Sequence, residues 1–153
     1  MKAVIQRVRC AQVEVDGRVM GACSGGFLVL LGVVREDTRE DAQILAKKVV
    51  QLRVFEDEED KMNLSLLNTG GGLLVVSNFT LAADCTGGRR PSFFGAMPPQ
   101  QAQELYEDFV ACCRAEGVET QTGVFGAHMH IIQHDDGPVT ILLDSNELKR
   151  KKS

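Results

Sequence analysis

Two hydroxyl side chains that follow an apolar run are the first candidates for chemistry in this chain. Ser77 and Thr80 come directly after Leu73-Leu74-Val75-Val76, a run typical of a buried strand. A serine or threonine becomes a nucleophile when an adjacent base accepts its proton. The sequence around Ser77 has no G-x-S-x-G elbow, and no motif supplies a base with an orienting partner. We therefore interpret both hydroxyls as hydrogen-bonding groups at a strand end, with nucleophilic attack as the alternative.

A glycine–proline pair is the second unusual feature. Gly137-Pro138 follows two aspartates and precedes Val139-Thr140 and the β-forming run Ile141-Leu142-Leu143. Proline has no N–H for a sheet ladder, so it is confined to the edges, first positions and bulges of strands. Composition alone predicts a turn here. A bond before proline can also be cis, at a cost of only about 0.5–1 kcal/mol.

Three histidines, His128, His130 and His134, share parity along one expected strand and precede Asp135, so they resemble a set of metal ligands. However, residues i and i+6 of a strand lie about 20 Å apart at ~3.3 Å per residue, so one ion cannot bind all three. We expect no metal and no cofactor. The five cysteines include no C-x-x-C pair, and we interpret them as reduced thiols.

Length and composition predict a single domain. The chain has 153 residues, of which 44% are hydrophobic and 25% charged, enough for one core. We place the domain at residues 1–148 and interpret 149–153 as a basic tail. Apolar runs fall short of the ~20 residues that span a membrane, so we expect a cytoplasmic protein with no membrane partner. The net charge of −4 argues against a protein that wraps nucleic acid but allows one that binds only an RNA end.

Turn and capping signals locate the hairpins and two helices that must position these groups. Asp16-Gly17 predicts a tight hairpin, and Ser24-Gly25-Gly26 predicts a turn into the apolar strand Phe27–Val34. Thr38 predicts the start of a helix that reaches residue 51. Pro98-Pro99 predicts a second helix, over residues 100–116.

The strands are expected in hairpin-like groups rather than in strict alternation with helices. Three of them follow the second helix: Thr120–Phe125, His128–His134 and Val139–Asp144. The total is seven or eight strands and two helices. This pattern favours an α+β layered fold.

Two short motifs together resemble the signature of a known enzyme family. Ser77-Asn78-Phe79-Thr80-Leu81 resembles the S-Q-x-x-L motif of the D-aminoacyl-tRNA deacylases, and Asp135–Thr140 resembles their N-x-G-P-x-T motif. Asn78 stands where the family usually has Gln, and Asp135 stands where it has Asn. Further segments resemble the family's in order and spacing over nearly the whole chain: Met1–Val8, Leu28–Val33, Arg53-Val54-Phe55, Lys61–Leu64, Arg90–Phe93 and Gly123–Ala127.

The resemblance implies both a fold and an activity. The fold is a barrel-like double sheet, antiparallel or mixed, flanked by two helices. The activity is hydrolysis of D-aminoacyl-tRNA at its 3′ end, and of glycine mischarged on the alanine tRNA, as chiral proofreading in translation. The catalytic segment would be Ser77, Asn78, Phe79 and Thr80. In it, the backbone N–H groups of Phe79 and Thr80 would polarise the ester carbonyl, with water attacking and the terminal 2′-hydroxyl assisting.

The same resemblance assigns the remaining site residues. It implies a homodimer in which Gly137-Pro138 of one subunit, with a cis bond, enters the other subunit's active site and excludes L side chains. Arg7 would orient the carbonyls of that loop with its fixed donors, whereas the residue type alone indicates a strand-edge arginine. Asn78, Phe125 and Met129 would bind the 3′-terminal adenosine. From its pattern alone, Met129 is a core residue.

Two other classes of function remain open at this point. One is a related deacylase with relaxed chirality, which a trans bond between Gly137 and Pro138 would favour. The other is a module that binds the 3′ end of RNA without catalysis. Deacylation assays on matched D-, L- and glycyl-tRNA distinguish these three classes.

Overall fold

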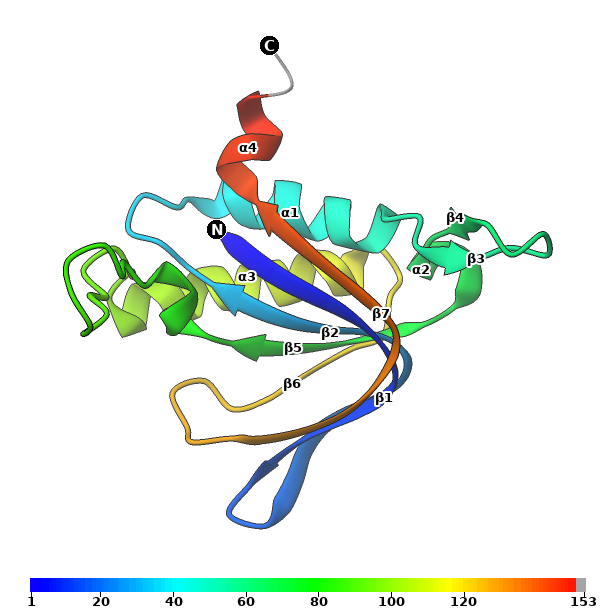
Figure 1. Cartoon of the computed structure of the whole chain (residues 1–153), viewed down its shortest axis with the longest axis horizontal. Helices are drawn as coiled ribbons and strands as arrows, with labels where there is room; N and C mark the ends of the chain where they lie inside the picture. Colours follow the sequence, from blue (N-terminus) through cyan, green and yellow to red (C-terminus); the bar gives the residue numbers. More distant parts are fainter. Residues whose placement is uncertain (151–153) are drawn as a thin grey trace.

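A five-stranded mixed sheet forms the body of the protein (Figure 1), and the structure, a computed structural model, describes residues 1–150. The strands lie in the order β6-β5-β2-β1-β7, and a small second sheet pairs β3 with β4. The strands are β1 Lys2–Val15, β2 Arg18–Gly32, β3 Phe55–Glu56, β4 Met62–Leu64, β5 Gly72–Ser77, β6 Thr120–Thr122 and β7 His130–Asp144. The helices are α1 Arg39–Gln51, α2 Leu66–Thr69, the 3-10 helix η1 Phe79–Ala82, α3 Pro99–Ala115 and α4 Ser145–Arg150.

The strand directions place the carboxyl ends of β5 and β6 at the same edge of the sheet. β1 pairs antiparallel with β2 and β7, whereas β5 runs parallel to both β2 and β6. The carboxyl ends of β5 and β6 therefore meet at the same edge, where the chain leaves at Ser77 and Thr122. In open sheets with parallel strands, ligands bind at such carboxyl ends.

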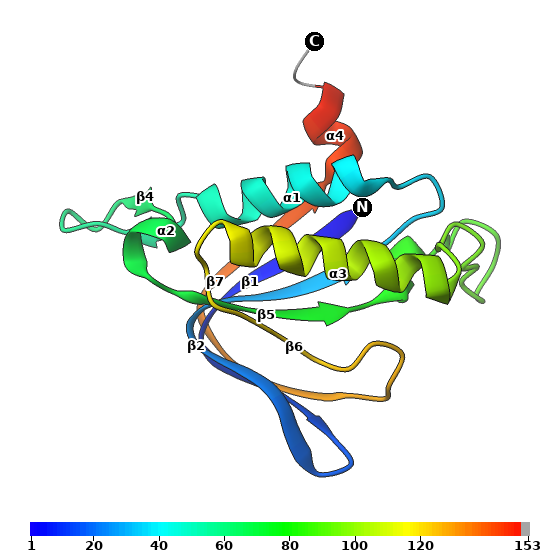
Figure 2. The same cartoon turned by 180° about the vertical axis from the view of Figure 1, so that it is seen from behind.

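The two long helices, α1 and α3, cover one face of the sheet (Figure 2). Phe27, Leu73 and Ile5 of the sheet are buried there against Leu45 of α1 and Phe109 of α3. These helices confirm the two that the sequence predicts, each within one or two residues of its expected bounds. The short helices α2 and α4 and the turn η1 carry no comparable signal in the sequence and were not predicted.

The opposite face of the sheet encloses a second, smaller core. Alternate residues of the central strands, such as Leu28 and Leu74, point to this side and pack with Val8 and Val13 of β1. This arrangement is possible because β1, β2 and β7 bend beyond the helical layer (Figure 1). The two faces give the layered α+β fold that the sequence and the resemblance predicted.

A close approach between β2 and β6 completes the bend. The Ala22 N–H donates a hydrogen bond of 2.8 Å to the side-chain oxygen of Gln121. A Cβ on the neighbouring Gly21 would lie 2.1 Å from the Thr122 carbonyl oxygen, so only glycine fits there. The first half of β2 thus lies against the outer strand β6, although the strand order places β5 between them.

Three expected boundaries are wrong. The strand expected over Thr120–Phe125 ends at Thr122, and residues 123–125 belong to the loop that follows β6. Ser24-Gly25-Gly26 is not a turn but a bend inside the continuous strand β2. There, a Cβ on Gly26 would lie 2.0 Å from the carbonyl oxygen of Gly72. Similarly, residues expected as two strands after residue 128 form the single strand β7, interrupted by a bulge around Gly137-Pro138. Asp16-Gly17, with positive φ at both residues, is the predicted hairpin turn.

The chain end differs from the basic tail expected at 149–153. Lys149 and Arg150 complete α4, and residues 151–153 lie outside the described part. The Lys149 Nζ lies 2.8 Å from the Oδ1 of Asp41 in α1, and the Ser145 hydroxyl donates to the same oxygen at 2.7 Å. These contacts fix α4 to α1. None of the helices within residues 1–150 is long and apolar enough to cross a membrane.

Candidate active site

The first signature segment forms a tight turn at the carboxyl end of β5. Ser77 ends the strand, Asn78 is the N-cap of η1, and Phe79 and Thr80 begin the 3-10 helix. The side-chain Oδ1 of Asn78 accepts a hydrogen bond from the Thr80 N–H at 3.2 Å and another from the Thr80 hydroxyl. One of the two expected N–H donors is therefore occupied by a neighbouring side chain.

The N–H of Phe79 has no such partner. It lies at the first position of η1, where no preceding helical carbonyl can accept it, and it makes no hydrogen bond with any described residue. Phe79 is 59% exposed, so the turn lies at the surface. This N–H is the group in the segment that is ready to bind an incoming carbonyl oxygen.

The hydroxyl groups of the segment lack the environment of a nucleophile. The hydroxyl of Thr80 donates to Asn78, an amide that cannot serve as a strong base. Ser77 is half-buried and its hydroxyl makes no hydrogen bond with residues 1–150. The strand-end hydrogen bonding expected of both hydroxyls is therefore seen for Thr80 and not for Ser77, and neither hydroxyl is paired with a base within residues 1–150.

The expected adenosine-binding residues lie in the loop between β6 and β7. This loop leaves β6 at the same sheet edge as η1, because the Gly123 N–H donates to the carbonyl of Val75 in β5. Phe125 is half-buried, with its ring 5.7 Å from the ring of Tyr106. Met129 is also half-buried and packs on the second core, where Gly123 leaves room for its sulfur. Both residues therefore serve the core and border this edge.

The second signature segment bulges out of β7. Gln6 of β1 pairs with Thr140, and Val8 of β1 pairs with Asp135. Residues 136–139 lie between these two pairs and have no paired residue in β1, where Arg7 alone stands opposite the four of them. The Gly137-Pro138 bond is cis, and both residues are exposed. A Cβ on Gly137 would lie 2.3 Å from the backbone nitrogen of Val139, so the bulge in this form requires glycine.

Arg7 is the support of this bulge, and it is not a snorkelling edge residue. Only 5% of it is exposed. Its Nε donates to the carbonyl oxygen of Asp136 at 2.9 Å, and its Nη1 donates to the Val54 carbonyl at 2.6 Å and to Glu56 Oε2 at 2.8 Å. The resemblance assigned it to the carbonyls of the Gly-Pro pair; here it holds the carbonyl that precedes the pair.

The two signature segments lie far apart within one chain. Across the sheet, Ser77 of β5 pairs with Leu31 of β2, and Leu31 pairs with Ala3 of β1. The bulge lies in β7, the third strand from β5, and beside Arg7, four residues along β1 from Ala3. Three strand spacings of ~4.8 Å and four residues of ~3.3 Å separate them, roughly 20 Å in total. Residues of one chain therefore cannot place η1 and the bulge on the same small substrate.

The histidines do not converge. The rings of His128 and His130 lie 5.2 Å apart, but His134 lies further along β7, opposite Cys10 of β1. Residues 1–150 contain no group of three or more His, Cys, Asp or Glu side chains placed to hold a metal ion.

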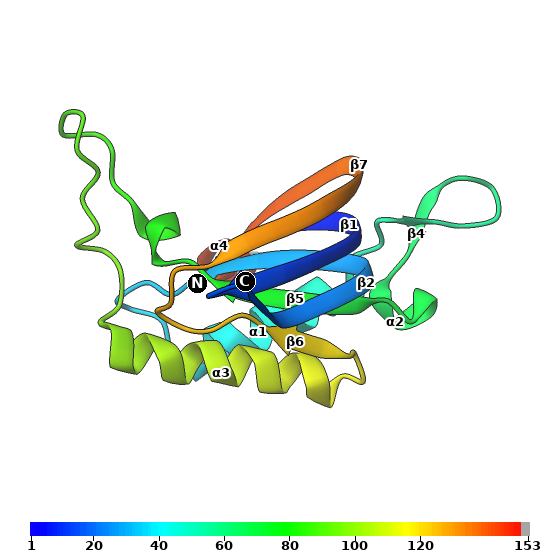
Figure 3. The same ribbon diagram turned by 90° about the horizontal axis from the view of Figure 1, so that it is seen from below.

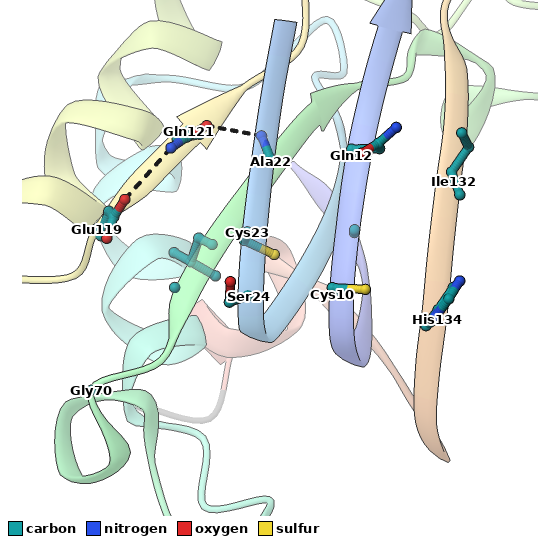
Figure 4. A pocket seen from close by; sticks show the side chains of 13 residues that line it. Cys10, Gln12, Ala22, Cys23, Ser24, Gly70, Glu119, Gln121, Ile132 and His134 are labelled. Atoms are coloured by element: carbon teal, nitrogen blue, oxygen red, sulfur yellow. Dashed lines mark hydrogen bonds between the residues drawn. The ribbon is translucent and has the colours of Figure 1, made fainter. Parts of the chain in front are cut away.

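A groove of about 600 Å³ lies on the bent part of the sheet (Figure 4). Its lining includes Cys10, Gln12, Cys23, Gln121 and His134, and none of the candidate site residues. Burial raises the pKa of the Cys23 thiol to about 11, so this thiol stays protonated and unreactive near neutral pH.

Comparison with known proteins decides the family. A family model described as D-Tyr-tRNA(Tyr) deacylase matches residues 4–144. The chain belongs to the D-aminoacyl-tRNA deacylase family. Relatives named D-aminoacyl-tRNA deacylase include one from Thermus aquaticus, 55% identical over 147 residues, with 96% of this chain and 97% of the relative covered. Another, from Alkaliphilus metalliredigens (strain QYMF), is 54% identical over 147 residues, with coverage of 96% and 99%.

Two solved structures share the deacylase fold. One, described as a c-Myc DNA unwinding element binding protein, is 40% identical with a TM-score of 0.87, covering 94% of this chain and 98% of its own. The other, described as a probable eukaryotic D-amino acid tRNA deacylase, has a TM-score of 0.80, with 93% and 97% covered. At 16% identity it shows the fold alone. The family resemblance and the α+β fold are thereby confirmed.

Sequence reasoning missed several residues that support the site. Val54 and Glu56, in and beside β3, accept hydrogen bonds from Arg7, and no sequence motif predicts this role. Phe93 packs edge-on against Phe79, with ring centroids 5.1 Å apart. In the sequence, Arg90–Phe93 stands out only as a segment that resembles the family. The two adjacent aromatic residues in an otherwise polar loop were the sequence feature that could have indicated a role for Phe93.

Proposed function

We propose that this deacylase hydrolyses the ester bond of D-aminoacyl-tRNA in the cytoplasm and releases a D-amino acid and free tRNA. The observation that carries the proposal is the unpartnered backbone N–H of Phe79 at the carboxyl end of β5. A backbone donor fixed in this way stabilises negative charge that develops on a carbonyl oxygen, as in an oxyanion hole. The family membership supplies the substrate class.

The chemistry requires no nucleophilic side chain. Water attacks the ester carbonyl carbon, and the N–H of Phe79 stabilises the oxyanion that forms. When the intermediate collapses, the bond from the carbonyl carbon to the ribose oxygen breaks and its electron pair passes to that oxygen. The proton lost by water reaches the ribose oxygen, with the neighbouring 2′-hydroxyl of the terminal adenosine as its carrier.

Asn78 couples substrate binding to the second donor. Its Oδ1 holds the N–H of Thr80 in the absence of substrate. If the Asn78 amide turns toward the terminal adenosine, the role that the family resemblance gives it, the Thr80 N–H is released toward the substrate carbonyl. Binding of the adenosine then completes the pair of donors.

We propose that the working unit is a homodimer. The bulge at Gly137-Pro138 lies roughly 20 Å from η1 of the same chain by strand geometry, so a partner's bulge must complete the site. The edge strand β7 is consistent with such an interface, because within residues 1–150 it pairs with β1 alone and exposes Ile131, Ile132 and Leu142. Long exposed edge strands with apolar side chains are commonly covered by another chain.

The bulge explains a chirality filter without a side-chain pocket. At the tip of the bulge the exposed residues are Gly137 and Pro138, which carry no polar or flexible side chain, so the tip offers mainly backbone and ring atoms to its surroundings, while the exposed Asp136 side chain lies beside Arg7. A rigid backbone surface beside the substrate's Cα rejects an L side chain by steric conflict while a D side chain points away. Glycine, which lacks a side chain, is also accepted, and many D-amino acids are substrates.

Timed deacylation of matched D-, L- and glycyl-tRNA tests this proposal. We expect release of the D-amino acid and of glycine, with the L-aminoacyl ester left intact. Comparable release from D- and L-substrates would establish a chirality-relaxed deacylase, and release from none would establish a module that only binds. Light scattering in the same buffer should give a dimer; an active monomer would refute the shared site.

A further inference from the structure

We propose that Phe93, Phe94 and Arg35, with Arg89 and Arg90, bind the unpaired nucleotides that precede the terminal adenosine of the tRNA. We call these five residues the aromatic–arginine surface. The inference rests on the proposed function, because it places the RNA strand beside the active-site turn η1. It adds a binding surface that acts on the RNA rather than on the ester.

The aromatic part of this surface is exposed and continuous with the active-site turn. Phe94 is 76% exposed and Phe93 is 37% exposed. The Phe93 ring contacts the Phe79 ring, so the surface begins at the turn that carries the free N–H. Both residues belong to the loop between η1 and α3, which projects from the body of the molecule (Figure 3).

Arg35 connects this loop to the rest of the fold. Its guanidinium carbon lies 4.5 Å from the centroid of the Phe94 ring, and its Nε donates to the Phe94 carbonyl. The Arg35 N–H also donates to the Gly95 carbonyl at 3.0 Å, which fixes the base of the loop. The stacked pair of Arg35 and Phe94 is therefore held in place. The two terminal guanidinium nitrogens of Arg35 make no hydrogen bond to a described residue.

The charges of the surface are positive on a protein that is acidic overall. Arg89 and Arg90 are exposed and form no hydrogen bond or ion pair with residues 1–150, and the net charge of the chain is −4. Asp84 is the single acidic residue of loop 83–96, and its carboxylate accepts hydrogen bonds from Thr86 at 3.0 and 2.7 Å. Glu36 is the acidic neighbour of Arg35.

Single-stranded RNA is the partner that this chemistry fits. Bases that are not paired stack on aromatic side chains and on arginine planes, while phosphates bind free guanidinium groups. The substrate's acceptor end supplies such nucleotides, since they are joined covalently to the adenosine whose ester lies at η1. A paired stem would offer its phosphates but no open base faces for Phe94.

A two-substrate kinetic experiment tests the surface. The substrates are full-length D-aminoacyl-tRNA and D-aminoacyl-adenosine, which carries the same ester but no preceding nucleotide. Phe94→Ala and Arg35→Gln should each lower kcat/KM on the tRNA by roughly 5- to 100-fold, the range expected for loss of one stacked base. On D-aminoacyl-adenosine both variants should stay close to the unmodified enzyme.

Matched controls lie at the β1–β2 hairpin, remote from η1. Val19→Ala removes an exposed apolar side chain and Arg18→Gln removes an exposed charge, and both should leave the two substrates unaffected. Equal losses on both substrates, or no loss on tRNA, would overturn the proposal. If Arg35→Gln lowers Tm, the double variant Arg89→Gln, Arg90→Gln replaces it as the deciding variant, because it breaks no internal contact.

A binding arm separates this inference from the proposed function. Fluorescence anisotropy compares an RNA hairpin ending in unpaired C-C-A with the same hairpin made blunt. The enzyme should prefer the unpaired end, and Arg35→Gln should reduce the slope of log K against log salt by about 0.7. This result supports the surface even if no ester is hydrolysed, whereas equal affinity for both hairpins refutes it even if deacylation is efficient.

Discussion

The Nε atom of Arg7 donates a hydrogen bond of 2.9 Å to the carbonyl oxygen of Asp136, the residue before Gly137. The same guanidinium reaches Val54 and Glu56 near the second sheet, so one side chain joins the bulge of β7 to an element that lies about 80 residues earlier in the chain. A lysine has one nitrogen on a flexible stem and cannot serve these acceptors in fixed directions.

Arg7→Lys should therefore damage both stability and activity. We expect the free energy of unfolding to fall by about 2–4 kcal/mol, because buried acceptors lose their charged donor. Deacylation of D-aminoacyl-tRNA should fall further than stability explains, because the bulge loses its orientation. Urea unfolding and initial rates measure the two effects. Arg53→Lys is the control and should change neither, because Arg53 is exposed and, among the described residues, its side chain donates to the Asn63 carbonyl alone.

The family and the elements of the fold could be predicted because their signals are local. Asp16-Gly17 predicts its hairpin from turn chemistry, and Thr38 with Asp41 forms the capping box that begins α1. The turn expected at Ser24-Gly25-Gly26 is wrong for a physical reason. Glycines allow either a turn or a close approach of two backbones, and the distant partner Gly72 decides between them.

The site was predicted less completely, because its key relations join distant residues. The free N–H of Phe79 and the occupied N–H of Thr80 differ only through the Asn78 side chain, which replaces the usual Gln of the family. The spacing of Arg7 and Asp136 in the sequence does not predict the hydrogen bond between the Arg7 side chain and the Asp136 carbonyl. For the histidines, strand rise alone predicted that His134 lies far from His128, and the structure places His134 opposite Cys10 while only His128 and His130 are close together.

The acid stability of the fold should depend on Asp41, which is buried between α1 and α4. Burial by itself raises its pKa, but hydrogen bonds from Lys149, Ser145 and Thr38 outweigh burial and hold the pKa well below its ordinary value. A carboxyl with a depressed folded pKa contributes stability above its unfolded pKa of about 4. That contribution disappears as the pH falls from there through the folded value.

Lys149→Met tests this contact. It should lower the free energy of unfolding by about 1 kcal/mol near pH 7, because a charged donor to a buried carboxylate is lost. The difference from the unmodified protein should shrink below about pH 4, where the unfolded state binds a proton that the folded state resists. Lys47→Met, at an exposed position of α1, should show no such dependence. A constant difference from pH 3 to pH 7 would contradict the assignment.

Thr80→Ala should retain substantial activity. The hydroxyl of Thr80 donates to Asn78 and has no adjacent base, so water rather than this oxygen attacks the ester. We expect kcat/KM to stay within about tenfold of the unmodified enzyme, whereas loss of a true nucleophile costs many orders of magnitude. Mass spectrometry of the quenched reaction should show no acyl group on residue 80. A trapped acyl-Thr80 in the unmodified enzyme would refute the water mechanism.

Asn78→Gln should raise kcat/KM on D-aminoacyl-tRNA modestly, by about 2- to 10-fold. A fully engaged second oxyanion donor would contribute more than this, and we expect the substitution to free the Thr80 N–H only in part. The longer side chain reaches further toward the adenosine and no longer caps the Thr80 N–H at its present distance of 3.2 Å. Asp135→Asn should act in the same direction, because it removes a negative charge near RNA and adds a donor. If both changes lower the rate, the two residues are adaptations of this enzyme.

Gly137→Ala should abolish selective deacylation without unfolding the protein. The new Cβ would lie 2.3 Å from the nitrogen of Val139 and 3.1 Å from its Cγ2, so residues 136–139 must shift. A displacement of about 1 Å at a positioned site costs on the order of 10²-fold in rate, and we expect at least this loss on bulky D-aminoacyl-tRNA. Gly25→Ala is the matched control, because a Cβ there meets nothing within 4 Å. Both variants should be dimeric by light scattering and fold normally by circular dichroism. A Gly137→Ala enzyme with full rate and full rejection of L-aminoacyl-tRNA would show that the bulge does not face the substrate, and chirality would then have to be set by residues around η1.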